Sequence, residues 1–229
     1  MGVHDGHRDR LRDQVLKHGL DTLNDVNVLE LVLFYALPRI NTNEVAHALL
    51  DRFGGLEAVF NASIEDLQTV PGVGPPTALF ISLFRQLPRR FEINQTRSMK
   101  TITSPEDAGA YFLPRLRGET NEKLFLLCLD TQKRMLDCVE IASGSINDVQ
   151  VSIRKIAETA IKSRASSVIL AHNHPDGTAR PSKEDELTTR SIANALHLLN
   201  IPVVDHIVVG ADEYISFAKS GLLNSRGFI

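Results

Sequence analysis

The spacing of apolar residues changes once along this chain, across the polar segment from Glu92 to Lys100. Before this segment, apolar residues recur at the three- and four-residue intervals of amphipathic helices, with Ser, Asp, Gly and Pro at the expected helix ends. After it, short β-branched runs alternate with helical segments, which predicts strands mixed with helices. We therefore expect an all-α domain over residues 1–95 and an α/β domain over residues 101–229, joined by a short linker.

The first domain is expected to be a compact bundle of four to six helices. One helix begins at Thr42 or Asn43, and Gly54 ends it because glycine adopts the left-handed conformation of a helix C-terminus without strain. The other expected helices are Arg8–His18, Val28–Leu37 with Asp25 as its cap, Leu56–Asn61, a short helix after Ser63, and Thr77–Arg90.

The second domain is expected to pack helices on a sheet. Ser167–Ala171 is a short apolar run rich in β-branched residues, as in a strand buried on both faces. Ser104 followed by Pro105 predicts a helix start. The remaining expected elements are the strands Leu124–Leu129, Met135–Ile141 and Val203–Val209 and the helices Val151–Ser163 and Lys183–Leu199.

Composition excludes several classes of protein. No apolar run approaches the roughly 20 residues of a membrane-spanning helix, and the N-terminal residues carry no apolar signal segment. Hydrophobic residues make up 43% of the chain, as in globular proteins. Cys128 and Cys138 are too few for a disulfide framework, so we expect a cytoplasmic protein with no membrane association.

The charge of the chain gives no general support for nucleic-acid binding. The net charge is −3, and each predicted domain is close to neutral. Residues 1–100 hold 11 Lys and Arg against 12 Asp and Glu, and residues 101–229 hold 14 against 16. A local basic patch remains compatible with these totals.

The strongest chemical signal follows the expected strand Ser167–Ala171. His172 and His174 lie two residues apart where the strand ends, so their side chains project from the same face. Ser182 begins the next helix, and Asp185 in the first turn of that helix can point back toward the strand end. Two imidazoles and one carboxylate are a ligand set for zinc that leaves a fourth position open for water, as in catalytic sites.

The same residues have a simpler interpretation. Pairs of histidines at this spacing are common, and Ser182 with Asp185 also forms a helix cap in its own right. The two interpretations are compatible, because a cap can fix the geometry of a ligand.

The motif resembles that of a known family. The spacing His-x-His-x7-Ser-x2-Asp over residues 172–185 matches the signature of JAMM/MPN metalloproteases. The string His-Asn-His-Pro at residues 172–175 and the segment at 204–210 resemble the bacterial RadC family, the UPF0758 group. Residues 29–31 and 53–56 are similar to the helical N-terminal region of that family. The resemblance implies that the second domain is a cytidine-deaminase-like MPN domain, with α-β-α layers and a mixed sheet.

The resemblance also implies roles for individual residues. His172, His174 and Asp185 would hold Zn²⁺, which lowers the pKa of a water in the open position from about 15.7 to nearer 7. Ser182 would donate a hydrogen bond to the oxyanion that forms when water attacks an amide carbonyl. Glu122, which precedes the first expected strand, matches the family's carboxylate base.

Other candidates for these roles are weaker. Glu119 and Glu140 are the alternatives to Glu122 as the base, and an exposed position at a strand start is the simpler interpretation of Glu122. For His206, a role beside the metal ligands or a structural hydrogen bond is favoured over a fourth ligand position.

The chain departs from the family pattern at two places. Ile153 and Lys155 flank Arg154 where related sequences have Pro and Glu, and Asp176 stands where Ser is usual. None of these residues is an expected ligand, so the departures concern substrate preference rather than metal binding.

Residues 70–78, Val-Pro-Gly-Val-Gly-Pro-Pro-Thr-Ala, resemble a helix-hairpin-helix element that would span about residues 63–91. Gly72 and Gly74 would let backbone N–H groups face a DNA phosphate, giving weak contact independent of sequence. Related hairpins often carry Lys two residues before the position of Ala78, where this chain has Pro76 followed by Thr77. A hairpin that only packs within the domain is therefore the favoured interpretation.

Two classes of function remain in view. The first is a metallopeptidase-type hydrolase that cleaves a peptide or isopeptide bond in a peptide or protein substrate. The second is a DNA-associated accessory protein in repair or recombination with a non-catalytic zinc site. A metal-dependent nuclease is disfavoured, because two His and one Asp lack the paired carboxylates typical of two-metal phosphodiester cleavage.

Overall fold

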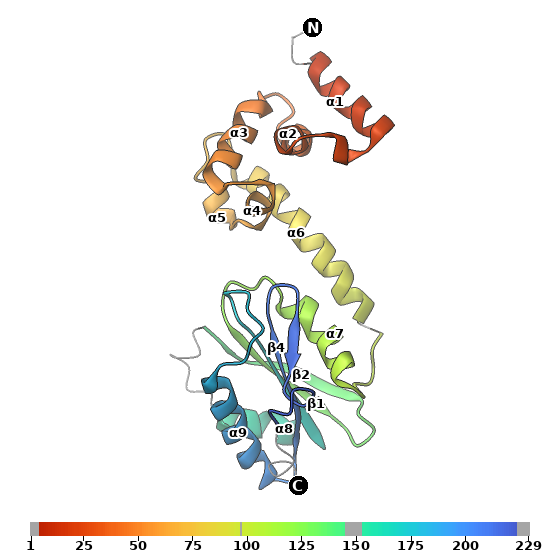
Figure 1. Cartoon of the computed structure of the whole chain (residues 1–229), viewed down its shortest axis with the longest axis vertical. Helices are drawn as coiled ribbons and strands as arrows, with labels where there is room; N and C mark the ends of the chain where they lie inside the picture. The colour runs from red at the N-terminus through yellow and green to blue at the C-terminus, as the bar shows by residue number, and fades with distance from the viewer. Residues whose placement is uncertain (1–4, 97, 145–152, 224–229) are drawn as a thin grey trace. The chain divides into compact units, whose positions relative to one another are not determined.

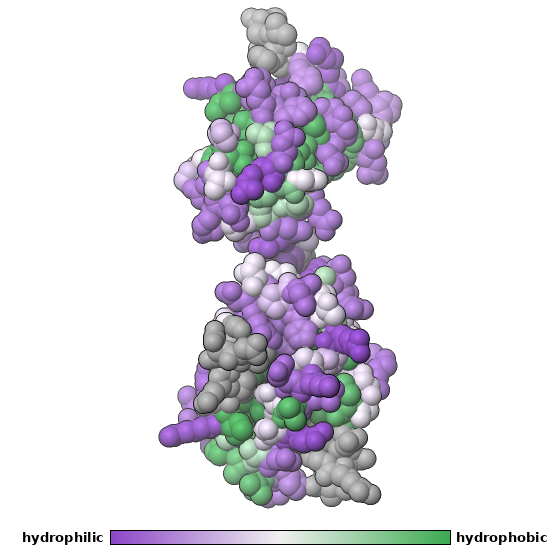
Figure 2. Space-filling model, turned by 60° about the vertical axis from the view of Figure 1, so that its left-hand side comes forward, coloured by the Kyte–Doolittle hydropathy of each residue, from purple (hydrophilic) through white to green (hydrophobic). Residues whose placement is uncertain are grey.

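The computed structural model describes residues 5–96, 98–144 and 153–223, which form two compact units that divide between Arg90 and Phe91 (Figure 1). Each unit has its own hydrophobic core. Polar side chains cover most of the face that Figure 2 shows, with smaller apolar areas between them. Among the described residues, no helix is both long and apolar enough to cross a membrane.

The first unit is helical, as expected. Its core is formed by leucines and valines of successive helices, including Leu29, Leu33, Leu49 and Leu67, all fully buried. The elements are α1 (Asp5–His18), a 3₁₀ turn (Leu20–Thr22), α2 (Asp25–Ala36), α3 (Thr42–Phe53), α4 (Leu56–Asn61), α5 (Ile64–Leu67) and the start of α6 (Pro75–Thr96).

Two expectations for this part of the chain are wrong. The cap of α2 is Asn24, whose side chain accepts a hydrogen bond from the N–H of Asn27, and Asp25 lies in the first turn. Helix α6 continues to Thr96, through more than half of the expected linker. Contacts to later residues stabilise this extension: Glu92 pairs with Arg117 at 2.6 Å, and the Thr96 hydroxyl accepts a hydrogen bond from Arg115.

The second unit contains a five-stranded mixed sheet. The strands lie in the order β2-β1-β3-β4-β5, with β3 and β4 parallel and all other neighbours antiparallel. The elements are α7 (Pro105–Leu116), β1 (Lys123–Leu129), β2 (Met135–Ser143), α8 (Ile153–Lys162), β3 (Ser167–Asn173), α9 (Lys183–His197), β4 (Val203–Val209) and β5 (Tyr214–Ser216).

Helices cover both faces of the sheet, so the expected α/β class with a mixed sheet is confirmed (Figure 1). Ile169 and Ala171 of β3 pack on the side of α7, whereas Val168 and Leu170 pack on the side of α8 and α9. Every residue of β3 is buried. The strand extends two residues beyond its expected end, so His172 belongs to it and faces α9.

Strand β5 was not expected from the sequence. It has three residues, too few for a periodic pattern, and it forms because β4 offers a free edge at Ile207–Val209. The expected helix over 151–163 begins in residues outside the described part of the chain, and its described portion is α8.

The chain between β3 and α9 is held against the end of β4. The N–H of His174 donates to Val209, and the N–H of Ala211 donates to Gly177. Gly210 fits closely beneath this loop: a Cβ there would lie 2.5 Å from the Gly177 oxygen and 2.7 Å from the Ala179 nitrogen. Both are backbone atoms, so the loop itself would have to move.

Replacing Gly210 by Ala should therefore lower the free energy of unfolding by about 1–3 kcal/mol, the usual cost of overpacking. Chemical denaturation followed by circular dichroism measures this change. Gly55→Ala is the matched control, because a Cβ at Gly55 meets nothing within 4 Å. Equal stability of Gly210→Ala and the wild type would show that the loop is not held in this way.

Candidate metal centre

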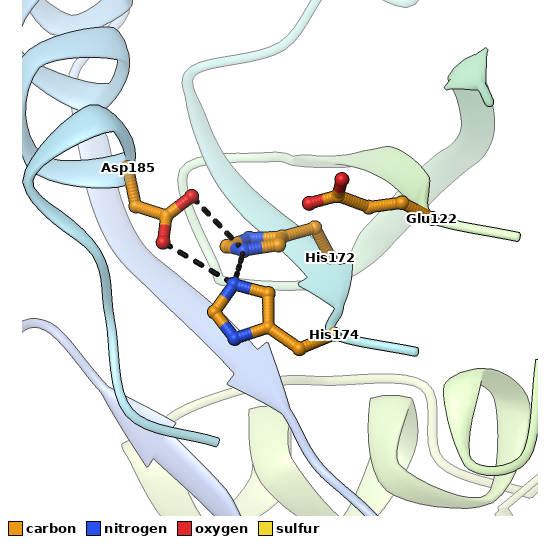
Figure 3. Close-up of side chains that lie close together, drawn as sticks. All are labelled: Glu122, His172, His174 and Asp185. Atoms are coloured by element: carbon orange, nitrogen blue, oxygen red, sulfur yellow. Dashed lines mark hydrogen bonds and ion pairs between the residues drawn. The ribbon is translucent and has the colours of Figure 1, made fainter. Parts of the chain in front are cut away.

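Four side chains that could hold a metal ion converge in the second unit. Ligand atoms of Glu122, His172, His174 and Asp185 all lie within 4.8 Å of one another (Figure 3). The two histidine Nε2 atoms are 3.0 Å apart. The two carboxylate oxygens of Asp185 lie 3.1 Å from the Nε2 of His172 and 3.3 Å from that of His174.

Three elements bring these residues together. His172 lies in β3 and His174 follows it directly, so both rings reach the same side of the sheet. Asp185 lies in the first turn of α9, whose N-cap is Ser182. Glu122 immediately precedes β1, and the pairing of Leu124 with His172 places this end of β1 beside the histidines.

The spacing of the donor atoms fits a tetrahedral ion. With bonds of about 2.0–2.1 Å, two donors of a tetrahedral zinc ion lie roughly 3.3 Å apart. The three distances among His172, His174 and Asp185 are 3.0, 3.1 and 3.3 Å. Two imidazole nitrogens and a carboxylate are also the donor types that such an ion prefers. The residues present therefore fit a divalent ion.

Electrostatics keep Asp185 ionised. Burial by itself would raise the pKa of this carboxyl group, but hydrogen bonds from His172 and His174 outweigh burial and hold the pKa well below its usual range. The same contact raises the pKa of His174, against the opposing effect of burial. The carboxylate is thus ready to bind a cation, and an ion that binds there competes with the proton on His174.

Glu122 borders a pocket beside the cluster. The pocket has a volume of about 440 Å³, and its lining includes Glu122, His174, Arg180, Ser182 and Asp185. Glu122 is half-buried, and its negative charge contributes to the raised pKa of His174. Figure 3 shows its carboxylate reaching the histidines from a different element than Asp185. A small substrate group in this pocket would meet Glu122 and the donor cluster together.

Asn173 is a functional candidate that the sequence analysis missed. Its side chain is buried, accepts a hydrogen bond from the N–H of Lys123, and donates to the carbonyls of Asn121 and Glu119. These bonds hold the segment that carries Glu122 against the end of β3. The sequence gives no sign of this role, because the hydrogen-bond partners of Asn173 lie about 50 residues earlier in the chain.

Ser182 lies at the cluster with its hydroxyl already engaged. Its Oγ accepts from the N–H of Asp185 at 3.0 Å and donates to an Asp185 carboxylate oxygen at 2.7 Å. This is a capping box, so the helix-cap interpretation holds, and the same bonds orient a candidate metal ligand. The hydroxyl lines the pocket but must rotate before it can donate to a substrate oxygen.

The alternative bases do not join the group of four. Glu119 forms an ion pair with Lys123 at 2.7 Å, and Glu140 is an exposed residue of β2 that pairs with Phe125. His206 contacts the side of His172 away from the cluster, with its Nε2 2.7 Å from Nδ1 of His172. Burial lowers the pKa of His206 well below the ordinary histidine value, and the neighbouring His172 acts in the same direction.

Two of the three residues that depart from the family pattern, Lys155 and Asp176, have structural roles. Lys155 on α8 donates to the carbonyls of Ile141 and Glu140 in β2, which a glutamate could not do. Asp176 accepts a hydrogen bond from the N–H of Thr178 and so stabilises the turn after His174.

The predicted hairpin at Gly72 and Gly74 lies in the other unit. Gly72 has a φ of +88°, which favours glycine, and it turns the chain between α5 and α6. The first two residues of α6, Pro75 and Pro76, have no backbone N–H. Since N–H groups at a helix start are what bind a phosphate, the two prolines reduce the number of donors at this helix start.

Comparison with known proteins agrees with these features. Residues 102–222 match the family model described as the RadC-like JAB domain, and residues 6–79 match the one described as the UPF0758 N-terminal region. A UPF0758 protein of Paraburkholderia xenovorans is 34% identical over 93% of this chain and 84% of its own length. A second, from Paraburkholderia phytofirmans, is 35% identical over 93% of this chain and 82% of its own length.

Replacing Asn173 by Asp tests its hydrogen bonds with little change of shape. The new carboxylate oxygen would face two carbonyls that now accept bonds, so the free energy of unfolding should fall by about 1–3 kcal/mol. Asn194→Asp, on the exposed side of α9, is the control and should change it by less than about 0.5 kcal/mol. Equal effects in denaturant titrations would contradict the role given to Asn173.

Proposed function

Because this chain belongs to the UPF0758 family and carries its RadC-like JAB domain, we propose that it is a zinc-dependent hydrolase of the JAMM/MPN metallopeptidase type. Its substrate is an amide bond, peptide or isopeptide, in a peptide or protein. The observation that carries the proposal is the group of four, Glu122, His172, His174 and Asp185, beside an open pocket.

The proposed roles follow from position. His172 and His174 would hold the ion through Nε2, and Asp185 would hold it through its carboxylate. The ion, when bound, supplies Lewis acidity that makes water a nucleophile at neutral pH. Glu122 lies within reach of that position, takes the proton of the attacking water, and returns it to the leaving nitrogen.

Ser182 acts later in the proposed reaction. When the attacked carbonyl oxygen gains negative charge, the hydroxyl rotates from Asp185 and donates to that oxygen. Until then, its bond to Asp185 keeps the carboxylate aimed at the histidines.

The competing function is a DNA-associated accessory role with a non-catalytic ion. It predicts that the hydrolytic residues can change without loss of function and that DNA contact runs through Gly72 and Gly74. The two prolines at the start of α6 weigh against that contact.

Zinc content is the first test. Elemental analysis should find about one zinc per chain in the wild type and little in His174→Ala, because that change removes one of three protein ligands. His197→Ala, an exposed histidine at the end of α9, should keep the wild-type content. No zinc in the wild type after reconstitution would refute the proposal.

Glu122→Gln separates catalysis from binding. The amide keeps the shape of the side chain but takes no proton, so zinc should stay bound while hydrolysis falls by about 10²–10⁴-fold. Cleavage of a quenched-fluorescence library of linear and isopeptide-linked peptides measures the rate. Glu140→Gln on β2 is the control and should keep full activity. Undiminished hydrolysis by Glu122→Gln would remove Glu122 from the mechanism.

A further inference from the structure

Two buried polar side chains beside the cluster have no role in the reaction described above. Thr189 lies in α9, one turn after Asp185, and is 2% exposed. His206 lies in β4 and is 3% exposed. Burial of such groups is costly unless their hydrogen bonds are satisfied, and both are satisfied by the same short chain of contacts.

The direction of these hydrogen bonds can be assigned from the chemistry of the partners. The Thr189 hydroxyl lies 2.5 Å from the main-chain oxygen of Asp185, and a carbonyl oxygen can only accept. The single hydroxyl proton is therefore donated to Asp185. The second contact of Thr189 Oγ1, at 2.6 Å to Nδ1 of His206, then requires the proton to be on His206.

The chain of contacts continues to a proposed metal ligand. Nε2 of His206 lies 2.7 Å from Nδ1 of His172. A neutral His206 with its proton on Nδ1 has a lone pair on Nε2, so it accepts from the Nδ1–H of His172. With an ion bound, the Nε2 of His172 would therefore offer its lone pair to that ion, and without one this atom contacts Asp185 and His174.

The ring of His206 is held from several sides. It packs against Phe217 with ring centroids 4.8 Å apart. Its main-chain N–H donates to Asp205, and its carbonyl accepts from the N–H of Phe217. Strand pairing fixes its position along β4 relative to β3, since the two strands are parallel and Leu170 pairs with His206. A ring fixed in this way can orient its partner, His172.

His174 is oriented separately. Its Nδ1 lies 2.8 Å from the carbonyl of Thr178, so Nδ1 carries a proton and Nε2 is the nitrogen left for an ion. The two histidines thus present the same nitrogen to the cluster, one through a loop carbonyl and the other through His206 and Thr189.

We propose that Thr189 and His206 are positioning residues that select the tautomer and ring orientation of His172, so that its Nε2 lone pair faces the metal. The inference rests on the proposed function, because the role it assigns is toward the ion. The contacts begin and end at Asp185: its main-chain oxygen accepts from Thr189, and its carboxylate contacts the Nε2 of His172. Helix α9 therefore positions two ligands, Asp185 directly and His172 through the hydrogen-bonded pair Thr189 and His206, which we call the relay.

Zinc affinity in variants of Thr189 is the first test. Thr189→Val keeps the shape and removes the acceptor for His206, so the dissociation constant for zinc, measured by competition with a chromophoric chelator at constant pH, should rise about 10–100-fold. Thr189→Ser keeps the hydroxyl and should restore affinity to near the wild type. Thr159→Val is the matched control, because Thr159 also bonds the carbonyl four residues earlier, at 2.7 Å, but on α8.

The tautomer of His206 is the second test, and it needs no metal. Imidazole ¹⁵N NMR of the unmodified protein, metal-free and zinc-loaded, should find the proton of His206 on Nδ1 and none on Nε2. A proton on Nε2 overturns the relay, as does unchanged zinc affinity in folded Thr189→Val. If the wild type binds no zinc, the proposed function fails, and the His206 tautomer still decides whether the relay exists.

Discussion

Hydrogen bonding of β3 on both of its edges is the constraint on which the rest of the second unit depends. The strand pairs with β1 on one side and β4 on the other, and all seven of its residues are buried. The pairing with β1 brings Glu122 beside His172, and the pairing with β4 brings His206 beside the same ring. Because the register of a strand decides which face each side chain meets, a shift by one residue would turn both histidines away from α9.

Helix α9 places the negatively charged carboxylate of Asp185 against the two histidines at the end of β3. Its capping box points the carboxylate of Asp185 into the histidine pair while satisfying two backbone N–H groups. Burial of this carboxylate would be unfavourable alone, and the histidines compensate for it. The helix start therefore has two functions at once, local stability and ligand placement, and the two functions use the same bonds. The cap and metal interpretations of Ser182 and Asp185 are therefore compatible.

Long-range contacts that a local pattern does not reveal account for the differences between expectation and structure. Residues 92–96 are polar and aperiodic, yet they are helical because Glu92 and Thr96 contact arginines about 20 residues later. Asn173 between the histidines and Thr189 in helix α9 carry no local signal of a role, yet the side chain of each forms a hydrogen bond with a residue on another element. Between α5 and α6, Gly72 forms the expected turn with a positive φ, and Pro75 and Pro76 follow it without backbone N–H groups.

The sequence by itself determined the division into a helical part and an α/β part, the buried central strand, and the set of His172, His174 and Asp185. These follow from periodicity, cap residues and the short spacing of a motif, all of which act over a few residues, and the family resemblance added Glu122. Only the tertiary structure decided that Glu122 rather than Glu119 or Glu140 reaches the donor cluster, that Asn173 holds its segment, and that Thr189 and His206 contact His172. The physical reason is that strand register and helix packing bring these groups together across 17 to 54 residues, a separation at which no local pattern specifies which side chains meet.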